Sequence, residues 1–348
     1  MVERKGQVKL GLTECAGCHL RVMPDGSTLH GPPGNTAGGG EALTLLLQCF
    51  NQALAKNGKP ASPGELDYLS SAAPWVKADI HERFQTMSDA EVEAVDATAI
   101  PGTFARFNGG PFYITKIADL IGVKGRRYLD ATGTHRNRGP EDIARYGILV
   151  ATTDDGSIGP HKFMTDEQRR RTALSYRFSD EMMYALGKFI YSLEPPPNPN
   201  KFDPLANRGR KVFDDEDCAK CHDPKQGYAN NKLTPVDGFT VPENHPEKEH
   251  IMTRSVHTDP GLALKTRKGT GFYKVPGLRG LWYRGLLEHS GSVATLEDWF
   301  DPKRLRDDYV PTGWKGPGVK TRAVKGHEYG LDLPDNDRQA LIAFLRTL

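Results

Sequence analysis

The sequence predicts a mostly helical protein made of two related domains in tandem. The five-residue pattern Cys-x-x-Cys-His occurs twice, as CAGCH at 15–19 and as CAKCH at 218–222. A longer segment recurs after each pattern, at 116–134 and at 274–292. Alternating apolar runs that would indicate strands are sparse, whereas apolar residues at helical spacing are frequent. These observations favour a duplicated helical unit.

The Cys-x-x-Cys-His pattern is typical of covalent haem attachment. The composition predicts only about 0.002 such matches by chance, so two matches indicate a chemical role. Each cysteine sulfur would form a thioether to the haem, and the adjacent histidine would become the proximal iron ligand. We therefore predict two covalently bound c-type haems. Their attachment residues are Cys15 and Cys18 for the first haem and Cys218 and Cys221 for the second, with His19 and His222 as the proximal ligands.

Two other interpretations of the pattern are a redox-active cysteine pair and a zinc site. A thioredoxin-like pair follows a strand in a βαβ unit, and a zinc site needs further ligands at short spacing. No strand-like run leads into either motif, and glycine, proline and charged residues surround both. The sequence context therefore favours haem.

A proline-rich stretch divides the chain. In SLEPPPNPN, at 192–200, three consecutive prolines end the preceding helix and favour an extended connector. We predict an N-terminal domain at 1–194, a linker at 195–200 and a C-terminal domain at 201–348. Each domain closes with an amphipathic helix, expected within 179–193 and 334–348, where a capping signal precedes apolar residues at helical spacing. A helical insertion is expected at about 40–100 in the first domain.

The repeated segment indicates duplication. KIADLIGVKGRRYLDATGT, at 116–134, aligns without a gap to KVPGLRGLWYRGLLEHSGS, at 274–292. Haem motif, repeated segment and closing helix then occur in the same order in both halves, as duplication predicts. The identical pairs are Lys116/Lys274, Leu120/Leu278, Gly122/Gly280, Arg126/Arg284, Leu129/Leu287 and Gly133/Gly291.

Composition restricts the compartment and the partners. The 46 basic and 44 acidic residues nearly balance, so no strongly charged partner such as nucleic acid is indicated. No apolar run reaches the ~18 residues of a membrane span. The opening MVERKGQVKL lacks the apolar region of a signal peptide. Because covalent haem attachment normally takes place outside the cytoplasm, we expect a soluble periplasmic or otherwise extracytoplasmic protein whose leader has been removed.

The second half resembles a known superfamily. Two tandem motifs, together with VPGLRGLWYRGLLEHSGSVATLEDWFD at 275–301, resemble the bacterial di-haem cytochrome c peroxidases. Their superfamily includes the di-haem enzyme that matures tryptophylquinone cofactors and the rubber-cleaving di-haem oxygenases. KGHEYGLDLPDNDRQALIAFL, at 325–345, is more similar to the oxygenase-like branch. The resemblance implies that both halves are cytochrome c-like haem domains.

The resemblance also implies ligands for the second haem. Family peroxidases carry a methionine ligand at the position of Lys303, and no methionine follows Met252 in this chain. His327 resembles the distal histidine of the oxygenase-like branch, so we predict that His222 and His327 ligate this iron. His289 is the alternative ligand. Its other interpretation is a residue that hydrogen-bonds to a haem propionate or to the backbone.

Candidates around the first haem lie before, inside and after the first copy of the repeated segment. His30 lies where family peroxidases have a displaceable distal histidine, and an exposed loop histidine is its other interpretation. His135 could be a ligand, an acid/base group or a surface residue. Peroxide cleavage needs a group that moves a proton between the two oxygens, and family peroxidases use a glutamate. Glu141 is our first candidate for that carboxylate, and Asp130 is the second.

We therefore expect a peroxidase-like oxidoreductase. The C-terminal haem would relay electrons from a small donor protein, a cytochrome c or a cupredoxin, and the N-terminal haem would reduce hydrogen peroxide. The alternatives are a pure electron-transfer di-haem cytochrome and an oxygenase-like enzyme that activates dioxygen. Trp282, inside the repeated segment, is a candidate electron relay. The resemblance allows a calcium ion between the domains, but no acidic loop in the sequence predicts one.

Overall fold

The computed structural model describes residues 2–4, 7–8, 15–35, 91, 94–95, 97–104, 112–151, 156–158, 161–162, 176–177, 179–265 and 269–348. In this part of the chain helices predominate and every strand has two or three residues, so the expectation of a mostly helical protein is confirmed there. Most of the helical insertion expected at about 40–100 lies outside the described residues.

The bounds of the elements are as follows. The α-helices are α1 (Cys15–His19), α6 (Pro140–Ala151), α8 (Asp180–Tyr191), α9 (Pro204–Asp215), α10 (Gly261–Lys265), α11 (Leu281–Arg284), α12 (Leu296–Trp299) and α13 (Asp335–Arg346). The 3-10 helices are η1 (Val123–Gly125), η2 (Cys218–Lys220), η3 (Pro224–Gln226), η4 (Lys248–His250) and η5 (Pro302–Leu305).

The strands form five small sheets. Antiparallel pairs are β1 (Val2–Arg4) with β2 (Gln7–Val8), β3 (Leu20–Val22) with β4 (Thr28–His30), β5 (Thr103–Phe104) with β6 (Thr115–Lys116), and β10 (Leu233–Pro235) with β11 (Phe272–Lys274). In the fifth sheet β7 (Gly156–Ile158) lies between antiparallel β8 (His161–Lys162) and parallel β9 (Tyr176–Arg177).

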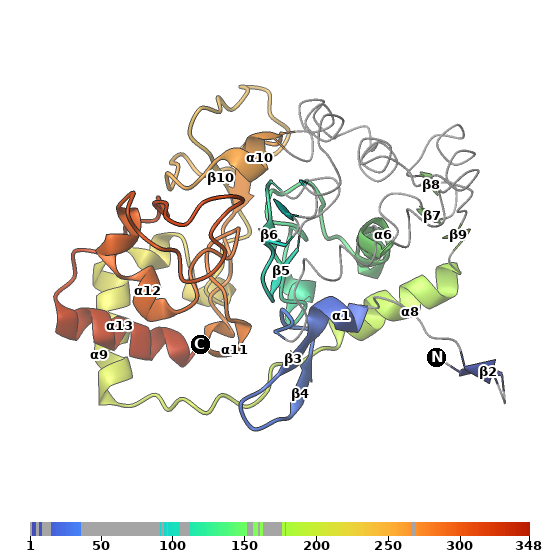
Figure 1. The fold of residues 1–348 in the computed structure, drawn as a ribbon, viewed down its shortest axis with the longest axis horizontal. Coiled ribbons are helices and arrows are strands. Elements are labelled where there is room, and N and C mark those ends of the chain that lie inside the picture. Colours follow the sequence, from blue (N-terminus) through green and yellow to red (C-terminus); the bar gives the residue numbers. More distant parts are fainter. Residues whose placement is uncertain are drawn as a thin grey trace.

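The second half is built around the pair α9 and α13, which lie together on one side of Figure 1. Asp203 caps α9 by accepting a hydrogen bond from the Ala206 N–H at 2.9 Å. A Cβ at Gly209 would lie 1.8 Å from the Ala340 carbonyl oxygen, so only glycine allows the two backbones to approach so closely. Phe213 and Phe344 fill the core beside this contact. As predicted for 334–348, α13 closes the chain.

The first half has a matching helix pair on the other side of Figure 1, formed by α6 and α8. Ser179 caps α8, which occupies most of the helix predicted within 179–193. Gly187 again permits the close approach, because a Cβ there would lie 2.4 Å from the Pro140 carbonyl oxygen. Buried Ile143 and Ile190 are part of the core between these helices.

The proline-rich stretch runs between α8 and α9 without helix or strand, and Figure 1 shows it passing beneath α13 to reach α9. Its end is fixed to the second half: the Asn198 side chain donates a hydrogen bond to the Arg346 carbonyl at 2.9 Å. Asn198 also accepts from the backbone N–H of Asn200 at 2.9 Å. The connector is therefore held against the end of α13.

The two copies of the repeated segment adopt the same local structure. Gly122 and Gly280 both have left-handed backbones, with φ of 71° and 78°, and each begins a short helix, η1 or α11. Leu129 donates its N–H to the His135 carbonyl at 2.9 Å. The equivalent Leu287 donates to the Val293 carbonyl at 2.7 Å. Both copies therefore close the same turn.

These copies also contact each other reciprocally. The Lys116 N–H donates to the His289 carbonyl at 2.8 Å. The Lys274 N–H donates to the Ala131 carbonyl, also at 2.8 Å. In the alignment Lys116 corresponds to Lys274 and Ala131 to His289, so the two bonds are equivalent. The interface between the halves thus has local two-fold character around the repeated segments.

A buried carboxylate reinforces that interface. Glu247 accepts hydrogen bonds from Arg127 Nη2 at 3.0 Å and from the Tyr128 hydroxyl at 3.1 Å, and it also pairs with Arg136. Both arginines and the tyrosine belong to the first half, whereas Glu247 belongs to the second. Two guanidinium groups therefore neutralise the charge of this carboxylate between the halves.

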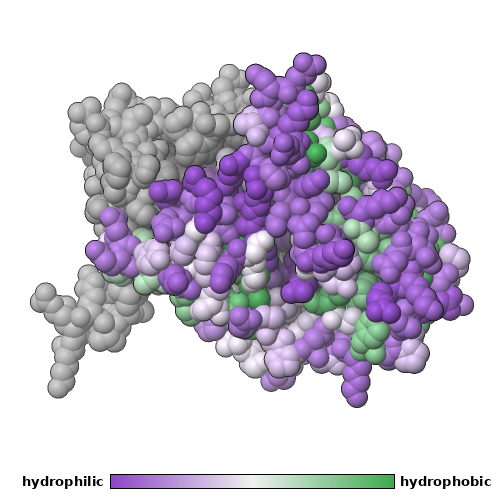
Figure 2. All heavy atoms as spheres, turned by 180° about the vertical axis from the view of Figure 1, so that it is seen from behind, coloured by the Kyte–Doolittle hydropathy of each residue, from purple (hydrophilic) through white to green (hydrophobic). Residues whose placement is uncertain are grey.

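The described part of the surface in Figure 2 is largely hydrophilic, and its apolar residues form small separate groups. No helix among the described residues is long and apolar enough to cross a membrane. The large apolar side chains that are exposed are Met182, Tyr184, Phe189, Phe202, Leu205, Val310 and Val319.

Candidate haem-binding sites

The second motif follows directly from the packed helix α9. Cys218 begins η2, and its carbonyl accepts hydrogen bonds from the N–H groups of Cys221, at 3.2 Å, and His222, at 2.9 Å. Cys218 also packs against the core formed by α9 and α13. One tight turn thus carries both cysteines and the histidine, and the core fixes where that turn lies.

The imidazole of His222 is buried and neutral. Burial lowers its pKa to about 4, although the carbonyls of Tyr228 and Pro276 partly oppose this effect. A histidine must be neutral to bind a metal ion, because the protonated ring has no free nitrogen lone pair. At neutral pH His222 is therefore ready to act as a ligand.

His327 faces His222 from a distant loop. The centroids of the two rings lie 6.3 Å apart and their planes differ by 52°. Burial, followed by the neighbouring His222, lowers the pKa of His327 to about 3, so this ring is neutral as well. Nδ1 of each ring is buried without a hydrogen-bond partner in the described part of the chain. Two neutral rings that face each other at this distance could both bind one group between them.

The separation of the rings fits an iron between them. An imidazole nitrogen lies about 2 Å from a bound metal, so two rings on opposite sides of one ion have centroids roughly 6 Å apart. A porphyrin supplies four nitrogens and leaves two axial positions for the protein. Within the described residues no three His, Cys, Asp or Glu side chains converge as they would around a bare metal ion. The separation of His222 and His327 suits a haem held between the two rings.

The thiols next to His222 are not tuned as a redox pair. Burial raises the pKa of Cys218 to about 11 and also raises the pKa of Cys221. Redox-active cysteines have lowered pKa values, because the thiolate is the attacking species. Both sulfurs are free of disulfides and half-buried. Their environment suits covalent attachment better than thiol exchange.

The first motif forms the short helix α1 and continues into β3. His19 Nδ1 lies 3.3 Å from the Gly31 carbonyl oxygen, which also accepts the Leu120 N–H at 2.9 Å. A bond at Nδ1 fixes the ring and leaves Nε2 free for a metal. Burial lowers the pKa of His19 to about 4. Cys18 is half-buried, whereas the side chain of Cys15 lies outside the described part.

The other two histidines proposed as iron ligands, His30 for the first haem and His289 for the second, have different surroundings. His30 is exposed on β4, where its backbone pairs with Leu20. His289 stacks on Tyr273, with ring centroids 4.4 Å apart, and forms an ion pair with Glu288. The structure thus brings His327, not His289, to the ring of His222.

Asp130 and His135 are together, whereas Glu141 is apart from them. Asp130 is buried and accepts hydrogen bonds from Thr132 Oγ1 at 2.6 Å and from the His135 N–H at 2.8 Å. Burial raises its pKa, but His135 and Thr132 outweigh burial and hold the pKa well below its usual range. The carboxylate also lies 3.5 Å from His135 Nδ1. Glu141 is exposed in the first turn of α6.

A carboxylate occupies the equivalent position in the second copy. Glu288 accepts a hydrogen bond from the Ser290 N–H at 2.8 Å and another from the Ser290 hydroxyl, as Asp130 does from Thr132. Burial raises the pKa of Glu288, but His289 and Ser290 outweigh it and lower the pKa to about 2. Both carboxylates are therefore ionised and hold their loops in shape.

A charged cluster lies between the motifs and was not predicted from the sequence. Asp119, buried next to Leu120, accepts a hydrogen bond from the Tyr283 hydroxyl at 3.2 Å. Arg126 and Arg284 each lie 3.9 Å from the same carboxylate. Asp119 raises the pKa of His19, opposing the larger effect of burial. Arg126 and Arg284 are repeat-equivalent, which was the only sequence signal for this cluster.

Tryptophans also differ from expectation. Trp282, our candidate relay, lies edge-on to Tyr283, with ring centroids 5.1 Å apart. Trp299 instead lies beside the proposed ligand, with its ring centroid 5.2 Å from that of His327. Trp299 also belongs to the segment at 275–301 that carries the resemblance, although it was not selected as a relay.

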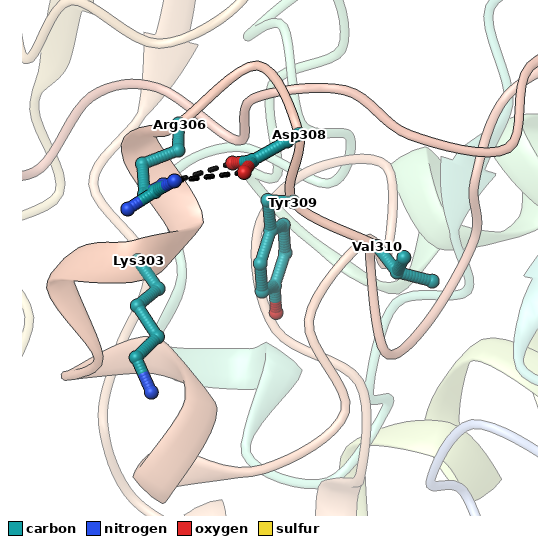
Figure 3. A pocket seen from close by; sticks show the side chains of 5 residues that line it. All are labelled: Lys303, Arg306, Asp308, Tyr309 and Val310. Atoms are coloured by element: carbon teal, nitrogen blue, oxygen red, sulfur yellow. Dashed lines mark hydrogen bonds and ion pairs between the residues drawn. The ribbon is translucent and has the colours of Figure 1, made fainter.

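A surface pocket of about 350 Å³ lies beside η5 and is lined by Lys303, Arg306, Asp308, Tyr309 and Val310 (Figure 3). Arg306 forms two hydrogen bonds of 2.8 Å with Asp308 across its rim. The Tyr309 hydroxyl is buried without a partner among the described residues. No residue of either haem motif lines this pocket, so it is separate from the predicted chemistry.

Comparison with known proteins adds only remote likenesses. No family model matches the chain, and no curated protein matches it significantly. One similar structure is a MauG-like protein associated with microbial copper homeostasis, with a TM-score of 0.38 and 15% identity over 67% of this chain and 73% of that one. Another is Kuenenia stuttgartiensis hydrazine synthase under xenon pressure, with a TM-score of 0.40 and 15% identity over 99% and 100% of the chains. Likenesses this remote assign neither a fold nor a function to this chain.

Proposed function

We propose that this chain is a di-haem c-type oxidoreductase with one haem in each half. The observation that carries the proposal is the facing pair of neutral, buried imidazoles, His222 and His327, beside Cys218 and Cys221. A bound haem supplies one-electron redox chemistry and, where an axial position is open, a site for peroxide or dioxygen. The equivalent turns and reciprocal bonds of the two repeated segments support a duplicated, two-domain arrangement.

The two sites have different tasks in this proposal. His222 and His327 would occupy both axial positions of the second haem and so exclude substrate from its iron. That site would relay electrons from a small donor protein, a cytochrome c or a cupredoxin. The first haem, held by Cys15, Cys18 and His19, would then be the reactive one. Its substrate in this proposal is hydrogen peroxide, as the resemblance to the di-haem peroxidases implies.

Asp130 and His135 suit proton handling better than Glu141 does. Asp130 is ionised and lies 3.5 Å from Nδ1 of His135, so it can orient the ring. Nε2 of His135 would hold the proton that peroxide reduction consumes. Glu141 is exposed, and an exposed carboxylate cannot keep water away from a reacting oxygen. Within this proposal His135 carries the proton and Asp130 positions it.

Peroxide reduction consumes two electrons and two protons and yields two molecules of water. The test mixes half-reduced protein with hydrogen peroxide in the presence of a reduced small cytochrome c. The proposal predicts that two donor molecules are oxidised for each peroxide consumed. His135→Ala and Asp130→Asn should slow this turnover about 100-fold or more while both haems remain bound. Glu141→Gln is the matched comparison and should change turnover little.

Other outcomes would replace the proposal. Absence of peroxide turnover in protein that carries both haems would indicate a pure electron-transfer cytochrome. Consumption of dioxygen together with an organic substrate would indicate the oxygenase-like alternative. Periplasmic or other extracytoplasmic localisation belongs to the same proposal, because the covalent attachment of haem normally takes place there.

A further inference from the structure

Arg304, in η5, is completely buried, with 0% of its surface exposed. A buried guanidinium is unfavourable unless its donors are satisfied. Arg304 satisfies them with backbone carbonyls: Nε donates to Trp299 at 2.8 Å, and Nη1 donates to Val324 at 2.7 Å and to Gly326 at 2.8 Å. Nη2 donates to the carbonyl of His327 at 2.8 Å. Three of the four bonds thus hold the loop that ends at His327.

The same guanidinium orders an aromatic side chain against the ligand ring. Arg304 Cζ lies 4.6 Å from the centroid of the Trp299 ring, which is a cation–π contact. That tryptophan ring in turn lies 5.2 Å from the ring of His327. Arg304 therefore acts on His327 twice, through the backbone carbonyl and through the packing of Trp299.

The loop needs such support because its backbone is unfavourable. His327 has φ of 49°, in the left-handed region that few residues other than glycine occupy, and Gly326 has φ of 87°. A Cβ at Gly326 would lie 2.4 Å from the backbone nitrogen of Thr258. The His327 N–H donates to the Val256 carbonyl at 2.7 Å. A conformation of this kind persists only when its surroundings fix it.

We propose that Arg304 is the positioning residue that holds His327 in place opposite His222. The inference rests on the proposed function, since it takes His327 to be an axial ligand. Without Arg304 the loop carbonyls lose three charge-assisted hydrogen bonds, and the left-handed turn at His327 relaxes. His327 would then hold the haem for only part of the time. No sequence motif pointed to this arginine.

The test replaces Arg304 in the full-length protein with both haems attached. Arg304→Met keeps much of the side-chain volume but removes all the donors, and Arg304→Lys keeps the charge but not the planar fork. The matched control is Arg322→Met. Arg322 also lies over a tryptophan, 5.3 Å from the Trp314 ring centroid, and donates to the Lys315 carbonyl at 2.7 Å. No hydrogen bond of Arg322 reaches the His327 loop.

The measurement is the high-spin fraction of the second haem by electron paramagnetic resonance, with and without added imidazole. Arg304→Met should raise that fraction about tenfold or more, and imidazole should restore the low-spin state. Arg304→Lys should give an intermediate fraction. Arg322→Met should lower the melting temperature without changing the spin state. If Arg304→Met does not fold, the high-spin fraction of Arg304→Lys alone tests the positioning role.

The positioning role of Arg304 and the ligand role of His327 can be refuted separately. An unchanged spin state in the Arg304 variants, with a high-spin iron in His327→Ala, would overturn the positioning role and leave the ligand assignment intact. An unchanged spin state in His327→Ala would overturn the ligand assignment itself. A high-spin fraction that imidazole does not restore would indicate general disorder of the domain and would also overturn the positioning role.

Discussion

The imidazole of His327 faces that of His222 with 6.3 Å between their centroids, although more than a hundred residues separate them in the sequence. His222 is fixed by the turn after α9, and His327 by a loop that the buried Arg304 holds. Both rings are neutral at physiological pH. This pairing places a second neutral imidazole beside the Cys218–His222 motif, where both rings could bind the same group.

Covalent attachment gives the first prediction. Thioether bonds survive unfolding, so the denatured chain should keep both haems, and mass spectrometry should show two haem-sized additions. Replacing Cys218 and Cys221 with alanine should remove one addition and leave the haem at Cys15 and Cys18. A matured protein without any addition would refute the haem assignment entirely.

Glu288 predicts how stability depends on pH. Its pKa is about 2 in the folded protein and near 4.5 when unfolded, so the unfolded chain binds the proton more tightly. The carboxylate therefore stabilises the fold fully above about pH 4.5, by on the order of 3 kcal/mol, and this contribution is lost as the pH falls toward 2.

Glu288→Gln should accordingly lower the free energy of unfolding at pH 7 and flatten its decline between pH 4.5 and 2. Urea denaturation at several pH values measures both effects. Glu243→Gln, in an exposed loop, is the control and should leave the curve unchanged. If the free energy of unfolding of Glu288→Gln fell with pH as steeply as that of the natural protein, the lowered pKa of Glu288 would be contradicted.

The helix crossing at Gly209 predicts a large packing effect. A Cβ at this position would lie 1.8 Å from the Ala340 carbonyl oxygen, so α9 and α13 would have to separate. We expect Gly209→Ala to destabilise the protein by about 3 kcal/mol, measured by thermal or urea unfolding. Gly125→Ala is the matched control, because a Cβ there meets nothing within 4 Å. Equal effects of the two substitutions would show that the crossing is not tight.

Sequence reasoning was most successful where the signal is local. The capping residue and apolar spacing at 179–193 predicted α8. Apolar spacing at 334–348 predicted α13, but the capping signal expected there is absent, because α13 begins after Pro334 without a side-chain cap. The gap-free alignment of the two repeated segments indicated that they share a local structure, and both copies form the same turn. These features depend on neighbouring residues, so the sequence displays them directly.

Contacts between distant residues could not be predicted in the same way. Nothing around Arg304 shows that it will be completely buried or that it will bind the carbonyls next to His327. Asp130 was selected as a proton carrier, but its burial and hydrogen bonds keep it ionised and fix its loop. His327 was selected through the resemblance, because spacing alone does not show that it meets His222.

Asp119 predicts a change in redox potential. Its carboxylate is buried and acts electrostatically on His19, so its negative charge would stabilise the oxidised form of a haem held by His19. We expect Asp119→Asn to raise the potential of the first haem by on the order of 50 mV, measured by potentiometric titration. Asp308→Asn, in an exposed ion pair, is the control. A fall in potential would contradict the stated sign.

The most direct test of the account is the spin state of His327→Ala. Imidazole supplies the strong axial field that keeps an iron low-spin, and alanine supplies none. Electron paramagnetic resonance of the purified protein should show a low-spin second haem that becomes high-spin in His327→Ala, while the first haem keeps its signal and His289→Ala leaves the second haem low-spin. A second haem that stays low-spin in His327→Ala, or becomes high-spin in His289→Ala, would contradict the pairing of His222 with His327.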